Sequence, residues 1–236
     1  MGRILFAVLA LALWGQMAVA QCRQALALAL DVSGSVDARE YRLQLDGLAG
    51  ALSHPDVRGA LLAMPSAPVT LAIYEWSGAQ DQRMLLGWTQ IVSDAQIDNI
   101  AAHLRSTQRV VSTPGTALGE TMLFGSDLLH QQSSCWKRTL DISGDGKSNI
   151  GPHPRAVSDR LQRGSVTINA LVIGADAPKI SDARQVDIAE ISSYFRAFVI
   201  VGPDAFVQTA LGFEAFEDAM VRKLLRELQG LALSSR

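Results

Sequence analysis

This sequence of 236 residues lacks the features typical of proteins that bind nucleic acid or reside in a membrane. Its 21 Lys and Arg are scattered and its formal net charge is −2, so no basic field points to nucleic acid or to an anionic surface. Beyond the N-terminus, no segment is long and apolar enough to span a bilayer. Internal repeats, low-complexity tracts and domain-splitting linkers are also missing, which favours one domain of ordinary size.

The N-terminus is typical of an export signal. A basic start is followed by an apolar run over residues 4–14 and then by Ala-Val-Ala. The run is shorter than the roughly 20 apolar residues that a bilayer span needs. We therefore expect a signal peptide over residues 1–20 and a mature protein in the periplasm or outside the cell. An uncleaved anchor is the alternative, and a lipoprotein that uses Cys22 is disfavoured because Gln21 stands where a small residue is expected.

Apolar strand-like runs alternate with amphipathic stretches over residues 21–236, which we expect to form a single domain. A hydrophobic fraction of 48% and a charged fraction of 19% fit a folded protein. The alternation predicts an α/β fold with a Rossmann-like, doubly wound, mostly parallel sheet and helices on both faces. Predicted strands cover residues 25–30, 69–76, 84–88 (at an edge), 139–143, 166–173 and 197–201, and predicted helices cover 37–52, 93–104, 116–129, 154–163, 186–194 and 213–228.

The first predicted strand ends in Asp31-Val32-Ser33-Gly34-Ser35. Ligand sites in open α/β sheets lie in the crevice outside the strand ends. Side chains at alternate positions of an extended loop point the same way, so Asp31, Ser33 and Ser35 can converge on one point. Gly34 lets the chain bend closely around that point. Taken alone, the segment could equally be a turn capped by its aspartate.

Two further loops carry similar side chains. The fourth predicted strand is followed by Asp145 between two glycines, although an Asp-Gly pair by itself is also common in turns. Thr116 precedes a predicted helix, where it could be only the N-cap. Three such loops in one α/β pattern favour a shared site over three unrelated turns.

In order and spacing, the segments DVSGS, GTALG and SGDGKSN resemble the metal-ion-dependent adhesion site (MIDAS) of von Willebrand factor A (vWA) domains and integrin inserted domains. The resemblance covers about residues 25–229. The segment YEWSG and the GDGKSN loop also resemble an exported bacterial branch of that superfamily. Gly144 departs from the family pattern, which usually has Thr or Ser directly before the final aspartate. The resemblance implies that a metal is held by Asp31, Ser33, Ser35, Thr116 and Asp145.

The five side chains implied by this resemblance offer only oxygen, which suits a hard cation such as Mg²⁺ or Mn²⁺ and disfavours zinc. Two carboxylates balance a dication, and the hydroxyls add no charge, so the metal stays electrophilic. Mg²⁺ prefers octahedral coordination and readily keeps waters, which leaves a position open. In the family, a carboxylate of the partner takes that position. We therefore expect a metal-dependent protein-binding or adhesion module, not an enzyme, whose protein partner presents an Asp or Glu.

The resemblance also bears on the two cysteines, Cys22 and Cys135. In the family, the strand that ends at Asp31 lies beside and parallel to the strand that leads to Asp145. Cys22 stands nine residues before Asp31, and Cys135 stands ten before Asp145. Parallel neighbours advance at the same rise per residue. A Cys22–Cys135 disulfide is therefore expected at the end of the sheet opposite the metal, in keeping with an exported protein.

Two alternative functions use the same fold. A metal-dependent hydrolase of the phosphoesterase type would need a nucleophile, a general acid or a basic clamp. Lys147 is the only basic residue in the motif loops, and no Asp-x-Asp pair or glycine-rich phosphate loop follows the first strand. A vWA scaffold that has lost its metal is the second alternative, and the five intact ligand positions disfavour it.

Other polar residues are less informative. Glu75 could orient a water near the site or lie exposed at an edge. Asp141 stands in a buried-looking strand and needs a cationic partner, for which Lys137 and Arg138 are nearby in the sequence. The four histidines are far apart, which is typical of ordinary polar positions.

Overall fold

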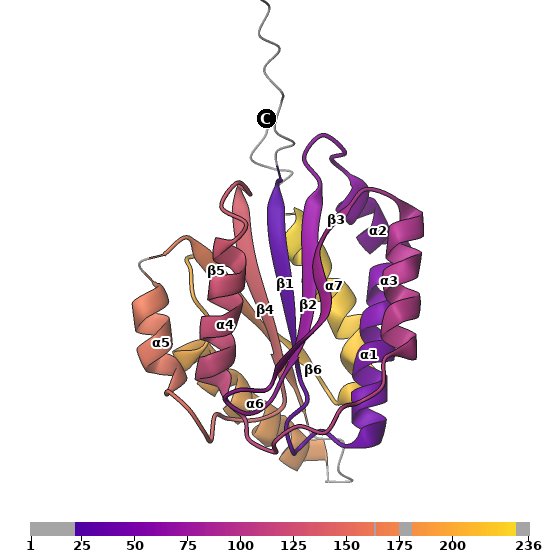
Figure 1. Cartoon of the computed structure of the whole chain (residues 1–236). Coiled ribbons are helices and arrows are strands. Elements are labelled where there is room, and N and C mark those ends of the chain that lie inside the picture. Colours follow the sequence, from indigo (N-terminus) through magenta and orange to yellow (C-terminus); the bar gives the residue numbers. More distant parts are fainter. Residues whose placement is uncertain (1–21, 163, 175–180, 230–236) are drawn as a thin grey trace, which may run out of the picture.

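The computed structural model describes residues 22–162, 164–174 and 181–229, so the predicted signal peptide lies outside the described residues. Six strands form one sheet in the order β3-β2-β1-β4-β5-β6 (Figure 1). All neighbours pair in parallel except β3, which is antiparallel to β2 at the predicted edge. The strands are β1 (Gln24–Asp31), β2 (Val69–Trp76), β3 (Gln82–Ile91), β4 (Lys137–Gly144), β5 (Val166–Ile173) and β6 (Val207–Ala210).

Helices cover both faces of the sheet, as predicted, and each layer encloses its own hydrophobic core (Figure 1). One face is covered by α1 (Ala38–Ser53), α2 (Pro55–Leu62), α3 (Asp94–Ser106) and α7 (Phe216–Gln229). The other face is covered by α4 (Leu118–His130), α5 (Pro154–Leu161) and α6 (Ser181–Phe198). The predicted doubly wound α/β fold is therefore confirmed.

The central strand β1 is buried along its whole length and presents a different side chain to each core. Its leucines face the layer of α1 and α7, and its alanines face the layer of α4 (Leu26, Leu28 and Leu30 against Ala25, Ala27 and Ala29). A Cβ at Gly125 of α4 would lie only 2.5 Å from a methyl of Leu140 in β4. Small residues thus let α4 approach the sheet closely, which places the loop before α4 over the strand ends.

One predicted strand is wrong, and two observed elements, β6 and α2, have no counterpart in the prediction. Residues 197–201 are not a strand, because α6 continues to Phe198 and Val201 forms only an isolated bridge with Ile168. Phe195 and Val199, four residues apart, lie in one core at helical spacing, so the apolar run packs as the end of a helix. The sixth strand is instead the short β6, and the helix α2 was not predicted at all.

The expected disulfide joins Cys22 and Cys135 and is confirmed. It lies where β1 and β4 begin, and the backbone N–H of Trp136 donates to the carbonyl of Cys22 at 2.9 Å. The bridge therefore ties the amino ends of two neighbouring strands, at the opposite end of the sheet from their aspartates.

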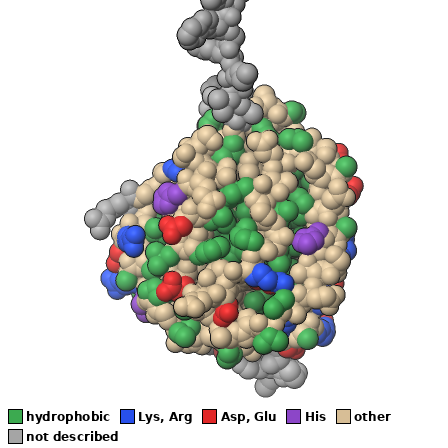
Figure 2. Space-filling view, viewed as in Figure 1, with side chains coloured by type: hydrophobic (Ala, Val, Ile, Leu, Met, Phe, Trp, Pro, Cys, Tyr) green, Lys and Arg blue, Asp and Glu red, His purple; other side chains and the backbone are tan. Residues whose placement is uncertain are grey.

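The edge strand β3 gives one face of the molecule an apolar centre. Hydrophobic side chains gather along the middle of the face in Figure 2, where β3 runs between α4 and α3 in Figure 1. Leu85, Leu86 and Trp88 of this strand are half-buried, and Met84 is 39% exposed. Within the described ranges, every helix is too short or too polar to serve as a bilayer span.

Candidate metal centre

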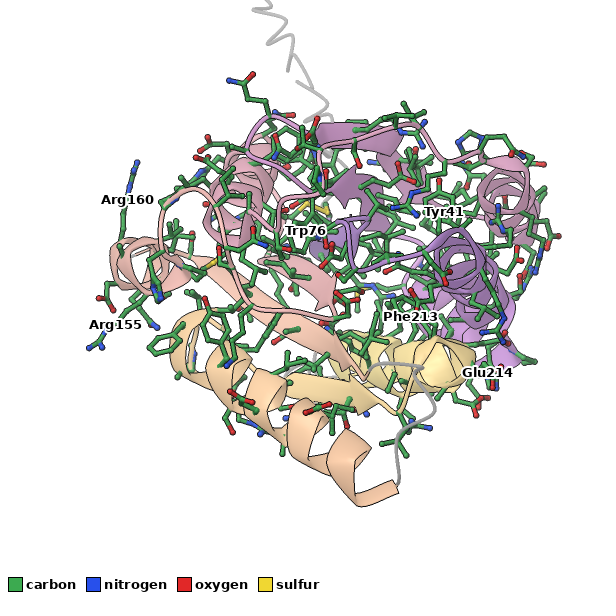
Figure 3. All side chains as sticks on the ribbon, turned by 90° about the horizontal axis from the view of Figure 1, so that it is seen from below. Tyr41, Trp76, Arg155, Arg160, Phe213 and Glu214 are labelled. Atoms are coloured by element: carbon green, nitrogen blue, oxygen red, sulfur yellow. A yellow bond between two sulfur atoms is a disulfide. The ribbon has the colours of Figure 1, made fainter. Side chains whose placement is uncertain are left out.

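The carboxyl ends of β1 and β4 lie side by side at one end of the sheet, which Figure 3 shows from below. The two strands pair in parallel through six residue pairs. Asp31 is the last residue of β1, and Asp145 directly follows β4. The pairing brings the two carboxylates of the predicted site to the same end of the molecule.

Asp31 is fully buried, and its two carboxylate oxygens have different surroundings. Oδ1 accepts a 2.8 Å hydrogen bond from the backbone N–H of Ser33. Oδ2 is buried, and no group in the described part of the chain donates to it with good geometry. Burial and the charge of Asp145 raise the pKa of Asp31 to about 7, although polar contacts from Ser33 and the Asp145 backbone offset part of this rise. A cation beside Oδ2 would favour the ionised carboxylate.

A chain of hydroxyls links this aspartate's loop to Asp145. The Oγ atoms of Ser33 and Ser35 lie 3.2 Å apart, and Ser35 donates a 2.7 Å hydrogen bond to Oδ1 of Asp145. Asp145 is half-buried, and burial raises its pKa. The structure therefore gathers four of the five predicted side chains into one connected set.

Thr116, the fifth predicted residue, is buried and is held through its backbone. Its N–H donates to the side-chain oxygen of Asn149 at 2.8 Å, and its carbonyl accepts from the N–H of Asn149 at 3.0 Å. The loop before it is joined to the first motif by a 3.1 Å hydrogen bond from the N–H of Gly34 to the carbonyl of Pro114. Asn149 therefore fixes the Thr116 loop to the loop after Asp145. Apart from the place of Asn149 in the SGDGKSN segment, nothing in the sequence indicates this role.

Glu75 does not contribute to this set. It is buried, so it is not an exposed edge residue, and its carboxylate accepts from the hydroxyl of Tyr41 at 2.5 Å and from Nε of Arg83 at 2.8 Å. The backbone of the site is supported instead by Gln44, which donates to the carbonyl of Asp31 at 2.9 Å.

The donor set fits a hard cation. A buried carboxylate oxygen that lacks a donor is costly, and a metal ion is one way to satisfy it. Among the described residues, no group of three or more His, Cys, Asp or Glu side chains is gathered, so the candidate set relies on two carboxylates and on hydroxyls. Such a set provides oxygen ligands alone, as Mg²⁺ and Mn²⁺ prefer.

A family profile described as "Protein of unknown function (DUF1194)" matches residues 21–232. The chain belongs to the DUF1194 family. A comparison with curated protein sequences gives no match.

Solved structures show which fold this DUF1194 protein has. Similar structures include proximal thread matrix protein 1 from the mussel byssus with a zinc-occupied MIDAS motif (14% identity, 89% of this chain, 46% of that chain, TM-score 0.57). The pilus adhesin SpaC from Lactobacillus rhamnosus GG is also similar (14% identity, 89% of this chain, 30% of that chain, TM-score 0.62). So is a von Willebrand factor type A protein from Catenulispora acidiphila (15% identity, 88% of this chain, 43% of that chain, TM-score 0.56). This chain spans less than half of each. The predicted vWA fold is confirmed.

Proposed function

We propose that this DUF1194 protein is an exported binding module that grips a protein partner through one divalent metal ion. The residues that hold the ion are Asp31, Ser33, Ser35, Thr116 and Asp145. The observation that carries the proposal is that the buried Oδ2 of Asp31 lacks a well-placed hydrogen-bond donor. In the same site, the hydroxyls of Ser33 and Ser35 form a chain that ends on the carboxylate of Asp145. When bound, the ion supplies a Lewis-acidic position that accepts an Asp or Glu carboxylate from the partner.

The charge balance supports binding of an anionic group. Two carboxylates neutralise a dication, and the three hydroxyl ligands add no charge, so affinity for a further carboxylate remains. Mg²⁺ or Mn²⁺ is the metal that this oxygen set favours. A fold neighbour is recorded with zinc in its MIDAS motif, so zinc belongs in any test of metal preference.

The fold neighbours and the N-terminal sequence support the same class of function. Two of the similar structures are named as a thread matrix protein and a pilus adhesin, both of which point to binding. The basic start and short apolar run of the sequence support export. No observation at the site favours a phosphoesterase or an empty scaffold over a binding module.

Metal binding is the first property to test. Mg²⁺, Mn²⁺ and Zn²⁺ are titrated by calorimetry into chelator-stripped protein that starts at residue 21. We expect saturable Mg²⁺ or Mn²⁺ binding that Asp145→Ala abolishes, because the variant removes half of the carboxylate charge. Asp127→Ala is the matched control, since that side chain is 87% exposed on α4 and away from the site.

Three outcomes would contradict the proposal. Equal metal binding by Asp145→Ala and by the wild type would show that the metal is not held at the proposed site. Absence of metal binding in the folded wild type, also with a carboxylate such as glutarate present, would favour the scaffold. Metal-dependent turnover of generic phosphoesters that Asp145→Ala loses would favour the hydrolase.

A further inference from the structure

Two exposed valines lie in the loop of residues 107–115, which leads to Thr116. Val111 is 99% exposed and Val110 is 53% exposed. Ile150, which follows the Asp145 motif, is 48% exposed and packs on Gly115, where an added Cβ would lie 2.8 Å from its methyl. Exposed apolar side chains therefore stand both in the segment that leads to Thr116 and against Gly115.

The loop that carries the valines is tied to the first metal motif. Arg109 donates to the carbonyl of Val36 at 2.6 Å and to that of Val32 at 3.1 Å. Thr113 donates through its backbone N–H and its hydroxyl to Asp81 in the β2–β3 turn. These bonds anchor the residues on either side of Val110 and Val111 to the first motif and to the β2–β3 turn.

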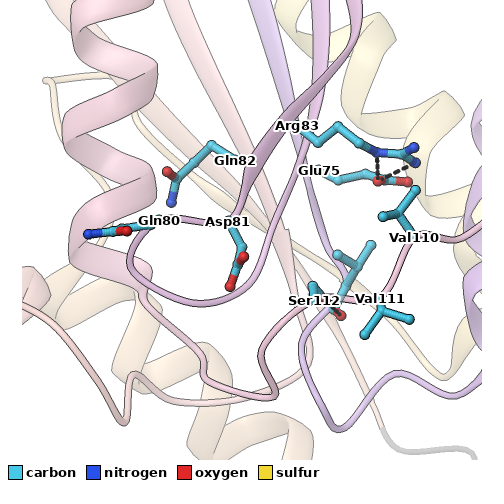
Figure 4. A pocket seen from close by; sticks show the side chains of 9 residues that line it. Glu75, Gln80, Asp81, Gln82, Arg83, Val110, Val111 and Ser112 are labelled. Atoms are coloured by element: carbon cyan, nitrogen blue, oxygen red, sulfur yellow. Dashed lines mark hydrogen bonds and ion pairs between the residues drawn. The ribbon is translucent and has the colours of Figure 1, made fainter.

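A cavity of about 200 Å³ opens next to the valines (Figure 4). Its apolar walls are Val32, Val110 and Val111. Three charged side chains lie at its wall: Arg83 bonds the carboxylate of Glu75, as the dashed lines in Figure 4 show, and the carboxylate of Asp81 accepts hydrogen bonds from Thr113. The cavity is smaller than the roughly 300–1,000 Å³ typical of small-molecule sites. Its size and lining suit one aliphatic side chain.

We propose that the partner is a protein segment in which an aliphatic residue stands next to the acidic residue, and that this aliphatic side chain enters the cavity between residues 80–83 and 110–112. This inference rests on the proposed function and specifies its partner. The partner carboxylate complements the charge of the metal, while the neighbouring side chain covers Val111. Gln80 at the same cavity offers its side-chain amide to the segment's backbone, whereas the amide of Gln82 already donates to the carbonyls of Gly78 and Ala79.

The test is a peptide array probed with the labelled protein in millimolar Mn²⁺. Each heptapeptide has a central Glu, and every flanking position is varied through all amino acids. Copies with a central Gln report the carboxylate requirement, and a wash in EDTA reports the metal requirement. We expect Leu, Ile, Val or Met at one flanking position to raise the Glu- and Mn²⁺-dependent signal about tenfold over Gly, as burial of one such side chain provides.

Variants separate this inference from the proposed function. The double variant Val110→Ser with Val111→Ser should lose the aliphatic preference and keep the Glu- and Mn²⁺-dependent signal. Val92→Ser is the matched control, since Val92 is 56% exposed at the far end of β3 and should keep both. Binding without any flanking preference, or a preference that the double variant retains, would overturn the inference alone. Absence of Mn²⁺-dependent binding to every peptide would overturn the proposed function, and the inference with it.

Discussion

Gly144 departs from the vWA pattern, and the structure supplies a steric reason. A Cβ at this position would lie 3.1 Å from Cζ of Phe195 and 3.3 Å from Oδ2 of Asp31. Phe195 of α6 is fully buried, so its ring has little freedom to move away. A side chain before Asp145 would therefore crowd both the core of α6 and the buried carboxylate.

Gly144→Ala is expected to lower the free energy of unfolding by about 1–2 kcal/mol, because the added methyl overpacks this contact. It should also weaken Mn²⁺ binding by crowding Asp31. Gly146→Ala is the matched control, since a Cβ there meets nothing within 4 Å, and its effect should stay within about 0.5 kcal/mol. Urea unfolding and calorimetry measure both quantities, and equal effects of the two variants would refute the steric explanation.

At the scale of elements, α7 buries a charged cluster against the sheet. Nζ of Lys223 lies 2.7 Å from Oδ2 of Asp141 and 2.7 Å from Oε1 of Glu227, and all three side chains are fully buried. Asn169 of β5 also donates to Glu227, at 2.6 Å. The cationic partner that Asp141 needs is therefore Lys223, while its sequence neighbours bond elsewhere: Lys137 donates to the carbonyl of Glu227 and Arg138 to the hydroxyl of Ser165.

The cluster has one ammonium for two carboxylates, so burial leaves an excess of negative charge. Burial raises the pKa of Asp141 to about 7, with the charge of Glu227 adding to the rise and Lys223 opposing it. Because the ordinary pKa is 3.8, the folded protein keeps a proton between about pH 4 and 7 that the unfolded chain has lost. Protonation of Asp141 therefore raises the free energy of unfolding at low pH, and this contribution is lost as the pH rises through 7.

The free energy of unfolding of the wild type should therefore fall relative to that of Asp141→Asn by about 2 kcal/mol between about pH 5.5 and pH 8.5. The comparison with Asp141→Asn removes the contributions of titrating groups outside the Asp141–Lys223–Glu227 cluster, because those groups are common to both proteins. Urea unfolding at the two pH values measures the difference. If the difference were the same at both values, Asp141 would be ionised throughout this range.

At the scale of the whole molecule, the disulfide and the candidate metal centre occupy opposite ends of the same two strands. Cys22 and Cys135 join the amino ends of β1 and β4, and Asp31 and Asp145 lie at their carboxyl ends. The bridge closes a loop with a sequence separation of 113 residues, so it constrains the unfolded chain strongly.

Replacing both cysteines by serine is expected to lower the free energy of unfolding by about 3–4 kcal/mol and to leave Mn²⁺ affinity within about twofold. The stability loss should match that of the wild type in a reducing agent, which serves as the control. Urea unfolding and calorimetry on the same samples test both statements. Loss of metal binding by a variant that is still folded would show that the two ends are coupled.

Local patterns in the sequence determined most of the fold and the composition of the candidate site. The apolar runs of β1 and β5 and the helical periodicity of α1 and α7 follow from which faces must be buried. The hydroxyls of Ser33 and Ser35 do meet, but in a turn closed by the bond from the N–H of Val36 to the carbonyl of Ser33 and not in the extended loop that the alternation predicts. With the family resemblance, the nearly equal spacings of nine and ten residues along two strands were sufficient to predict the disulfide.

Only the tertiary structure decided which distant groups meet. The bond from Ser35 to Asp145, the packing of Phe195 over Gly144 and the pairing of Lys223 with Asp141 join segments far apart in the chain. The pairing of β1 with β4 sets the first contact, and the packing of α6 and α7 sets the other two; no period in the sequence records either. For the same reason the apolar run at residues 197–201 was assigned to a strand, since short apolar runs suit a strand or a helix end equally until the surrounding core selects one.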